Sequence, residues 1–181
     1  TLAAESPDNE SEVGDPSGEA VQRFLSWIDD LQQRQATLDA ALPRWLNRDV
    51  LSVLVGQDHA QSFFVWLRER PFVEKRSHAW AYHEVVRTQM LRHNRQQSPR
   101  EWIELHGRLA AHYEESRDDL GLNGETKHTD ETWQRLALEA LYHRLCHAPR
   151  KELPGALNGF IAALRAERAL GRRWAKTTKQ A

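Results

Sequence analysis

The chain has 181 residues, a net charge of −1 and a hydrophobic content of 40%, including seven tryptophans, so it can bury a core without cross-links in one domain or two small ones. A single cysteine, Cys146, excludes an internal disulfide framework and indicates a reducing, cytoplasmic location. No apolar run reaches the roughly 18 to 20 residues that span a bilayer, so we expect no membrane partner.

Residues 1–18 differ in composition from the rest of the chain. They contain two prolines, two glycines, no Lys or Arg, and the acidic residues Glu5, Asp8, Glu10, Glu12 and Asp15. Such a segment has little to bury, and we interpret it as an acidic flexible arm. The remaining chain is mildly positive, which gives no strong argument for nucleic-acid binding. The first residue, Thr1, fits a segment of a longer polypeptide or a processed chain.

Three helices are predicted before residue 71. From Glu19 to Leu38 an apolar residue recurs every three or four positions, which predicts one amphipathic helix that ends before Pro43. Asn47 is suited to cap a short helix that ends at Gly56. We expect Asp58 to cap the next helix, which must end before the proline at 71. The short connection between these last two helices predicts a helix-turn-helix.

The stretch PFVEKRSHAWAYHEVVR, residues 71–87, predicts a β-hairpin followed directly by a helix. Two short runs with alternating polarity flank a turn near residues 76–78, and Trp80 and Tyr82 share one face of the second run. The helix is expected to begin near His83. The order of three helices and a hairpin is that of a winged-helix domain.

The rest of the chain is predicted to be helical. Ser98-Pro99-Arg100-Glu101 has the features of a helix start, with a capping serine and a glutamate that reaches back. A polar loop over residues 117–128 precedes a helix with apolar positions between Trp133 and Leu145. A last helix carries Leu157, Phe160, Ile161 and Leu164, and we expect it to fray into a basic tail over residues 172–179. Antiparallel helices of this kind resemble the start of a helical-repeat array.

The sequence contains no recognisable catalytic constellation. It lacks GxxxxGK[ST], GxGxxG and HExxH motifs. The histidine pairs worth weighing for a metal are His106 with His112 and His143 with His147; only the second shares a helical face, and no acidic or Cys partner is near in sequence. Cys146 lies on an apolar stripe, where a small core residue is expected rather than a nucleophile. We therefore expect no enzyme activity and no metal or cofactor in this chain.

DNA binding is the alternative that a helix-turn-helix raises. Its recognition helix would span residues 58–70. Aromatic and apolar side chains point in nearly every direction around that helix, its basic residues Arg68 and Arg70 lie at the far end, and Asp58 would face phosphates. Because phosphate neutralisation dominates affinity for DNA, this pattern favours a helix that faces protein.

Residues 80–87, Trp-Ala-Tyr-His-Glu-Val-Val-Arg, resemble the hairpin and His-acid-aliphatic-aliphatic-Arg motif in the winged-helix domain of STAND-class signalling NTPases. These include NOD-like receptors and apoptotic ATPases, and large LuxR-type activators have a similar layout. The segments ALPRWLNRDVLSVL (41–54), WIELHGRLAAHY (102–113) and EALYH (139–143) resemble the neighbouring elements. Glu84 replaces the more usual Asp, and Tyr82 replaces Met.

The resemblance implies a role for His83. In that family the motif histidine reaches the phosphates of ADP bound on the neighbouring NTPase domain and holds a resting state. A histidine at a helix N-terminus suits this role, since its ring and the free backbone N–H groups can both face an anion. Arg87, one turn further, would add charge or pair with Glu84. The structural alternative is that His83 only ties the hairpin to the helix by hydrogen bonds.

We thus predict a mostly α chain composed of an acidic arm (1–18), a winged-helix domain with a β-hairpin wing (19–97), an antiparallel, TPR-like helical domain (98–175) and a basic tail (176–181). The resemblance implies a non-catalytic regulatory segment of a STAND-type ATPase, in which ADP or ATP is held by an NTPase domain of the same polypeptide. The helical domain would bind a protein partner or effector. A winged-helix DNA-binding regulator is the alternative.

Overall fold

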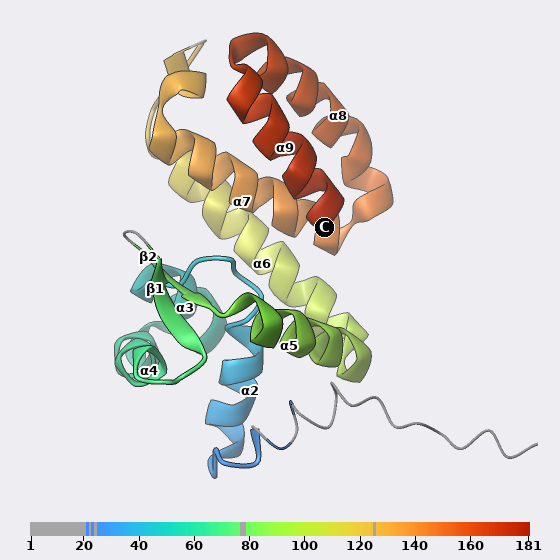
Figure 1. Cartoon of the computed structure of the whole chain (residues 1–181). Coiled ribbons are helices and arrows are strands. Elements are labelled where there is room, and N and C mark those ends of the chain that lie inside the picture. The colour runs from blue at the N-terminus through green and yellow to red at the C-terminus, as the bar shows by residue number, and fades with distance from the viewer. Residues whose placement is uncertain (1–20, 22, 24, 77–78, 125) are drawn as a thin grey trace, which may run out of the picture.

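The computed structural model describes residues 21, 23, 25–76, 79–124 and 126–181. This part of the chain is mostly helical and contains one antiparallel two-stranded sheet, as predicted (Figure 1). The arm assigned to residues 1–18 and the tip of the hairpin lie outside the described residues. The elements are α2 (Leu31–Asp39), α3 (Arg48–Val55), α4 (Gln57–Arg68), β1 (Val73–Arg76), β2 (Ala79–Tyr82), α5 (Glu84–Gln97), α6 (Pro99–Asp118), η1 (Thr126–Thr129), α7 (Glu131–His147), α8 (Pro149–Ala166) and α9 (Arg168–Gln180).

The helix boundaries predicted from capping residues before residue 71 are correct for α3 and wrong for α2 and α4. Asn47 caps α3 as predicted, since its Oδ1 accepts a hydrogen bond from the Val50 N–H at 2.7 Å. The single helix expected up to Leu38 is wrong, because Asp30 caps a new helix, α2, and interrupts the pattern. Asp58 caps nothing: α4 begins one residue earlier, after Gly56, whose φ of 83° ends α3 and starts α4.

The hairpin is tied to the helices on both sides. β1 and β2 pair in antiparallel register, with Val73 opposite Tyr82, and the Leu46 N–H donates to the Trp80 carbonyl at 2.7 Å. The buried Tyr82 hydroxyl donates to the Thr37 carbonyl in α2 at 2.8 Å. α2, α3, α4, the hairpin and α5 thereby share one apolar core.

The second half differs from the prediction at its end. Residues 172–179 do not fray into a basic tail; they belong to helix α9, which packs on α7 and α8 (Figure 1). Trp174 anchors this helix, because its indole N–H donates to the Ala156 carbonyl at 2.9 Å and its ring covers the Leu141–Leu145–Ala156 cluster. The start at Pro99 is confirmed, but the Ser98 side chain makes no capping hydrogen bond.

α8 exposes three of the four apolar side chains that the sequence analysis assigned to the last helix. It packs inward through Ala156 and Ala163, whereas Leu157, Ile161 and Leu164 are 53%, 47% and 45% exposed. Leu153, one turn earlier, is 45% exposed as well.

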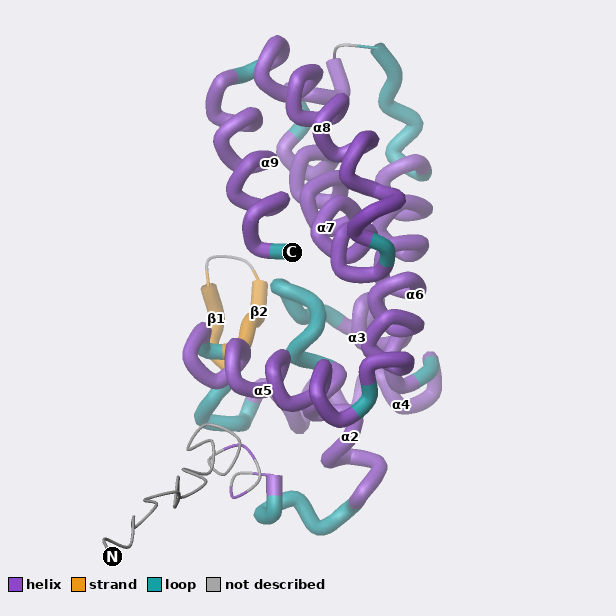
Figure 2. The backbone as a smooth tube through the Cα atoms, turned by 90° about the vertical axis from the view of Figure 1, so that its right-hand side faces the viewer, coloured by secondary structure: helices purple, strands orange, loops and turns teal. Residues whose placement is uncertain are grey.

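Helix α6 joins the two halves. It runs beside α7 on one side and contacts α3 and α5 on the other, as both views show (Figures 1 and 2). A second apolar cluster crosses the boundary predicted at 97/98, with Leu42 and Val50 packed against Trp102, Leu105 and Leu109. No helix in the described ranges is both long and apolar enough to cross a bilayer.

Two glycines of α8 allow a matched test of this packing. A Cβ on Gly159 would overlap the Trp174 indole, whereas a Cβ on Gly155 would meet nothing within 4 Å. Gly159→Ala is therefore expected to lower the free energy of unfolding by about 1–2 kcal/mol through overpacking, and Gly155→Ala to raise it by up to about 1 kcal/mol through helix propensity. Urea denaturation measures both. Equal effects of the two substitutions would contradict the packing of α9 on α8.

Candidate functional site

The structure places the two residues singled out in the sequence, His83 and Arg87, on different sides of α5's first turn. His83 precedes α5, its side chain is 46% exposed, and its Nδ1 lies 3.3 Å from the Glu74 carboxylate of β1. Its backbone N–H donates to the Phe72 carbonyl at 2.8 Å. His83 thus contacts the hairpin through its backbone and its ring, while the ring stays accessible.

Arg87 instead faces the interface between the first half of the molecule (α2 to α5) and the second half (α6 to α9). This interface, where the loop before α3 and the start of α5 meet α7 and α9, is called the joint below. Its Nη2 donates to the Leu42 carbonyl at 2.9 Å and to the Tyr142 hydroxyl of α7 at 3.3 Å. Its expected partner Glu84 forms no ion pair with it among the described residues. The guanidinium also lies over the Tyr142 ring, 5.7 Å from the centroid.

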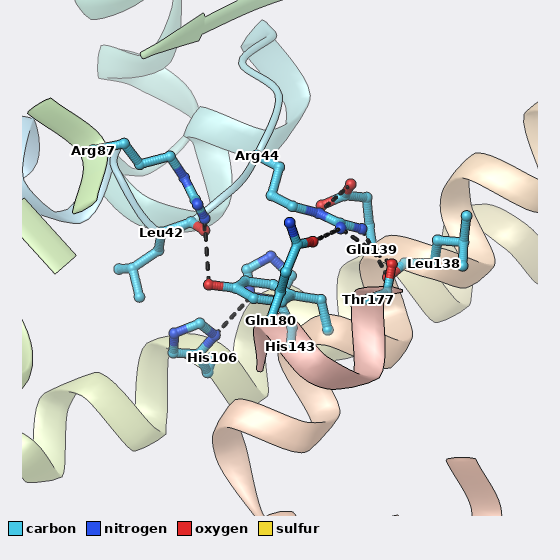
Figure 3. A network of polar contacts seen from close by, with 10 residues as sticks. Leu42, Arg44, Arg87, His106, Leu138, Glu139, His143, Thr177 and Gln180 are labelled. Atoms are coloured by element: carbon cyan, nitrogen blue, oxygen red, sulfur yellow. Dashed lines mark hydrogen bonds and ion pairs between the residues drawn. The ribbon is translucent and has the colours of Figure 1, made fainter. Parts of the chain in front are cut away.

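Arg44, which no sequence motif singles out, lies at the centre of the joint (Figure 3). It lies in the loop between α2 and α3 and reaches across to α7 and α9. Its Nε is 2.9 Å from Glu139 Oε1, and Nη2 donates to the Leu138 carbonyl at 3.0 Å. Its Nη1 donates to the side-chain oxygens of Thr177 and Gln180 at 3.2 and 3.3 Å. One guanidinium therefore links the loop before α3 to residues of α7 that lie 94 and 95 positions further along the chain, and to residues of α9 that lie 133 and 136 positions further.

Glu139 depends on this contact. Its side chain is 3% exposed, against 20% for that of Arg44. Burial raises the pKa of the Glu139 carboxyl, and the adjacent Arg44 charge and hydrogen bond oppose that rise. The second oxygen, Oε2, is buried without a hydrogen-bond partner among the described residues, so the contact with Arg44 is what compensates a negative charge at this site.

Two buried histidines meet beneath the joint. His106 of α6 and His143 of α7 are fully buried, and their Nδ1 atoms are 2.7 Å apart (Figure 3). One Nδ1 must donate and the other must accept, and because burial disfavours a charged imidazole, both rings are neutral and in opposite tautomers. Burial lowers the pKa of His106 to about 3, with the Arg87 charge as a further cause, and lowers that of His143 well below its ordinary value.

The histidines weighed as metal-ligand pairs each contact other groups in the structure. His143 faces His106, whereas the His147 Nδ1 is 2.9 Å from the Ile103 carbonyl. His112 stacks edge-on against Tyr113. The described residues contain no group of three or more His, Cys, Asp or Glu side chains placed to hold a metal. Burial raises the pKa of the Cys146 thiol to about 11, which disfavours a thiolate nucleophile.

A surface pocket of about 340 Å³ lies over the joint. The hairpin and the start of α5 form one side, and α7 and α9 form the other. Cationic side chains dominate its lining: Arg44, Arg76, Arg87, Arg135, Arg173 and Lys176, against the carboxylates Glu84 and Glu139. His83 does not line it.

The sequence contains one feature from which the buried histidine pair could have been predicted. His106 falls on the apolar stripe formed by Trp102, Leu109 and Tyr113, and a polar residue on a core-facing stripe indicates a buried hydrogen bond. No comparable signal marked Arg44, which lies in a loop. Comparisons of the chain with protein family models, with curated proteins and with solved structures gave no match.

Substitutions at Arg44 and Glu139 test whether this buried ion pair stabilises the folded protein. Arg44→Met leaves Glu139 buried without its cation and is expected to lower the free energy of unfolding by about 3 kcal/mol or more. The double variant Arg44→Met/Glu139→Leu removes both charges and is expected to regain most of that loss. Arg100→Met, which breaks an exposed pair with Glu104, serves as control with a change within about 0.5 kcal/mol. A double variant as unstable as the single one would contradict the assignment.

The histidine pair predicts a pH dependence of stability. Both pKa values are lowered in the folded protein, so below about pH 6.5 the unfolded chain binds up to two more protons than the folded one. Stability should fall as the pH drops from about 6.5 towards 3, by up to about 2.7 kcal/mol per pH unit. Asp39, whose pKa burial raises to about 6, opposes this trend between its unfolded value near 3.8 and 6.

Comparison of variants isolates the histidine contribution from that of Asp39. Urea denaturation of His106→Leu/His143→Leu at several pH values should give a flatter dependence than the original protein. His59→Gln, at an exposed position of α4, should keep the original slope. An unchanged slope in the double variant would show that the pair is not neutral in the folded protein.

Proposed function

We propose that this chain is a non-catalytic regulatory and interaction segment of a STAND-type NTPase, in which residues 19–97 are a winged helix and the helices that follow form a TPR-like array. The observation that carries the proposal is the arrangement of the first half. α3 and α4 pack together, the hairpin follows directly, and the Leu46–Trp80 bridge ties this hairpin to the loop before α3. His83 then falls where the family motif has its histidine, between the hairpin and α5.

The position of His83 is compatible with contact to a neighbouring domain. Its ring is accessible and its only ion-pair partner among the described residues is Glu74, itself partly exposed. A nucleotide phosphate held by the NTPase domain could replace Glu74 as the partner of the imidazole. The Nη2 of Arg87 is occupied in the joint, so in this proposal Arg87 contributes to nucleotide binding through the placement of α5.

The joint supports a rigid coupling between the two units. Arg44 and Arg87 attach the first unit to α7 and α9, and α6 packs against both. A rotation of the winged helix, when ADP is exchanged for ATP in the parent enzyme, would therefore move the helical array with it.

The outer face of α8 offers the helical array a surface for a protein partner. Leu153, Leu157, Ile161 and Leu164 lie along one stripe of the helix at steps of four, four and three residues. This spacing is the one with which a helix packs against another helix. The partner in this proposal is a further amphipathic helix, of the same or of another protein.

The exposed face of α4 does not favour the DNA-binding alternative. Within α4 the exposed positions are Gln57, Asp58, His59, Gln61, Ser62 and Val65. They include one carboxylate and no Lys or Arg. Arg68 instead stacks over the Phe64 and Trp80 rings, at 4.9 and 5.4 Å from their centroids. A duplex would find little charge to neutralise there.

The proposal is tested in the parent ATPase through His83. His83→Ala should speed ADP release by about tenfold or more, which corresponds to the loss of one charge-assisted hydrogen bond to the phosphates. His59→Ala, on the exposed face of α4, should leave the rate unchanged. Release of a fluorescent ADP analogue, followed by stopped flow, measures both.

Two outcomes would overturn the proposal. A gene that encodes no P-loop before this segment would remove the NTPase domain on which it rests. Saturable binding of this chain to random duplex DNA at ~50 mM salt, lost at higher salt, would favour the DNA-binding regulator instead.

A further inference from the structure

The pocket over the joint has an excess of positive charge that its own carboxylates do not balance. Six cationic side chains line it against Glu84 and Glu139, and Glu139 is already paired with Arg44. Arg76 pairs with Glu74 of the same strand. Arg135, Arg173 and Lys176 form no ion pair with any carboxylate among the described residues.

These three unbalanced cations converge from two helices. Arg135 extends from α7, and Arg173 and Lys176 lie on successive turns of α9. Arg173 donates through Nη1 to the neutral Gln134 Oε1 at 2.8 Å, which orients its guanidinium without cancelling its charge. Arg87 lines the opposite side of the pocket, with its Nη2 held by the Leu42 carbonyl and the Tyr142 hydroxyl. Positive charges held close together repel one another and destabilise the folded protein unless an anion lies between them.

We propose that this pocket binds an oligophosphate group, that is, a small molecule with at least two linked phosphates. Guanidinium groups donate in a planar fork that matches phosphate oxygens, and lysine adds a point charge. More than two uncompensated cations call for a ligand with more than one negative charge. The volume of about 340 Å³ lies at the lower end of small-molecule sites and suits such a group.

The site is distinct from the nucleotide contact assigned to His83 and does not require the NTPase domain. His83 is absent from the lining, whereas residues of the hairpin, α5, α7 and α9 all contribute. A ligand in this pocket touches both halves of the molecule. Its binding would therefore stabilise their relative arrangement, on top of the Arg44 and Arg87 contacts.

Isothermal titration of the 181-residue chain with inorganic pyrophosphate, at ~50 mM salt to limit screening, tests the proposal. One saturable site is expected. Arg135→Gln and Lys176→Gln should each weaken binding about tenfold, as expected for loss of one charge-assisted contact. Both side chains are exposed, so the fold is retained, which far-UV circular dichroism checks. Arg150→Gln and Lys151→Gln, at exposed positions of α8 outside the pocket, are the matched controls and should leave the affinity unchanged.

Further ligands separate the source of the phosphates from the recognition itself. ADP that binds as tightly as pyrophosphate, or more tightly, supports the site and assigns the source to a nucleotide; ADP that binds more weakly supports it and assigns the source to a free oligophosphate. Sulfate that binds as tightly as pyrophosphate, no saturable binding, or equal losses in the pocket and control variants would each overturn the proposal.

Discussion

The joint between the two halves depends on the ion pair of Arg44 with Glu139. A carboxylate buried in α7 is stable only if a cation and hydrogen bonds replace the water that it loses. The only cation that an ion pair brings to Glu139, among the described residues, comes from the loop between α2 and α3. That requirement fixes this loop against α7, and the remaining donors of the same guanidinium then hold the C-terminal turns of α9 through Thr177 and Gln180. These hydrogen bonds add to the packing of Leu170 and Trp174 that holds α9 against α7 and α8.

The arginines also determine the chemistry beneath them. Arg44 and Arg87 both lie over the Tyr142 ring, and their charges add to burial, the main cause, and to His106 in lowering the pKa of His143. A protonated imidazole at this depth would repel them and would lose its acceptor Nδ1. The neutral His106–His143 hydrogen bond is therefore the arrangement that the surrounding charge permits, and it makes the contact between α6 and α7 sensitive to acid.

The elements that the sequence predicted are those with a local cause. Asn47 and Pro99 act within a few residues of themselves, so the starts of α3 and α6 followed from the pattern. Asp58 and Ser98 have the right chemistry for caps, but Gly56 and the tight turn between α5 and α6 set the chain direction instead. α9 was missed because its helix depends on tertiary packing of Trp174 and Leu170 against α7 and α8, in a segment whose composition is mostly polar.

The site was less predictable than the fold because its partners are distant in sequence. Arg44 and Glu139 are 95 residues apart, and no periodicity links a loop arginine to a helix carboxylate. His83 was singled out because residues 80–87 resemble a family motif, whereas the pocket was not predicted, since Arg135, Arg173 and Lys176 look like ordinary surface residues in the sequence. Their convergence is visible only once α9 is folded back over the joint.

Stability alone does not explain a joint made of charges. Apolar residues of similar volume would fill the same space at lower cost, because Glu139 Oε2 and Arg87 Nε remain buried and unpartnered among the described residues. A guanidinium, by contrast, donates hydrogen bonds only in fixed directions within its plane. It therefore selects one orientation of α7 and α9, where an apolar contact would tolerate several. The charged joint thus specifies the arrangement of the two halves, and it leaves at their border a positive pocket that an apolar joint would not have.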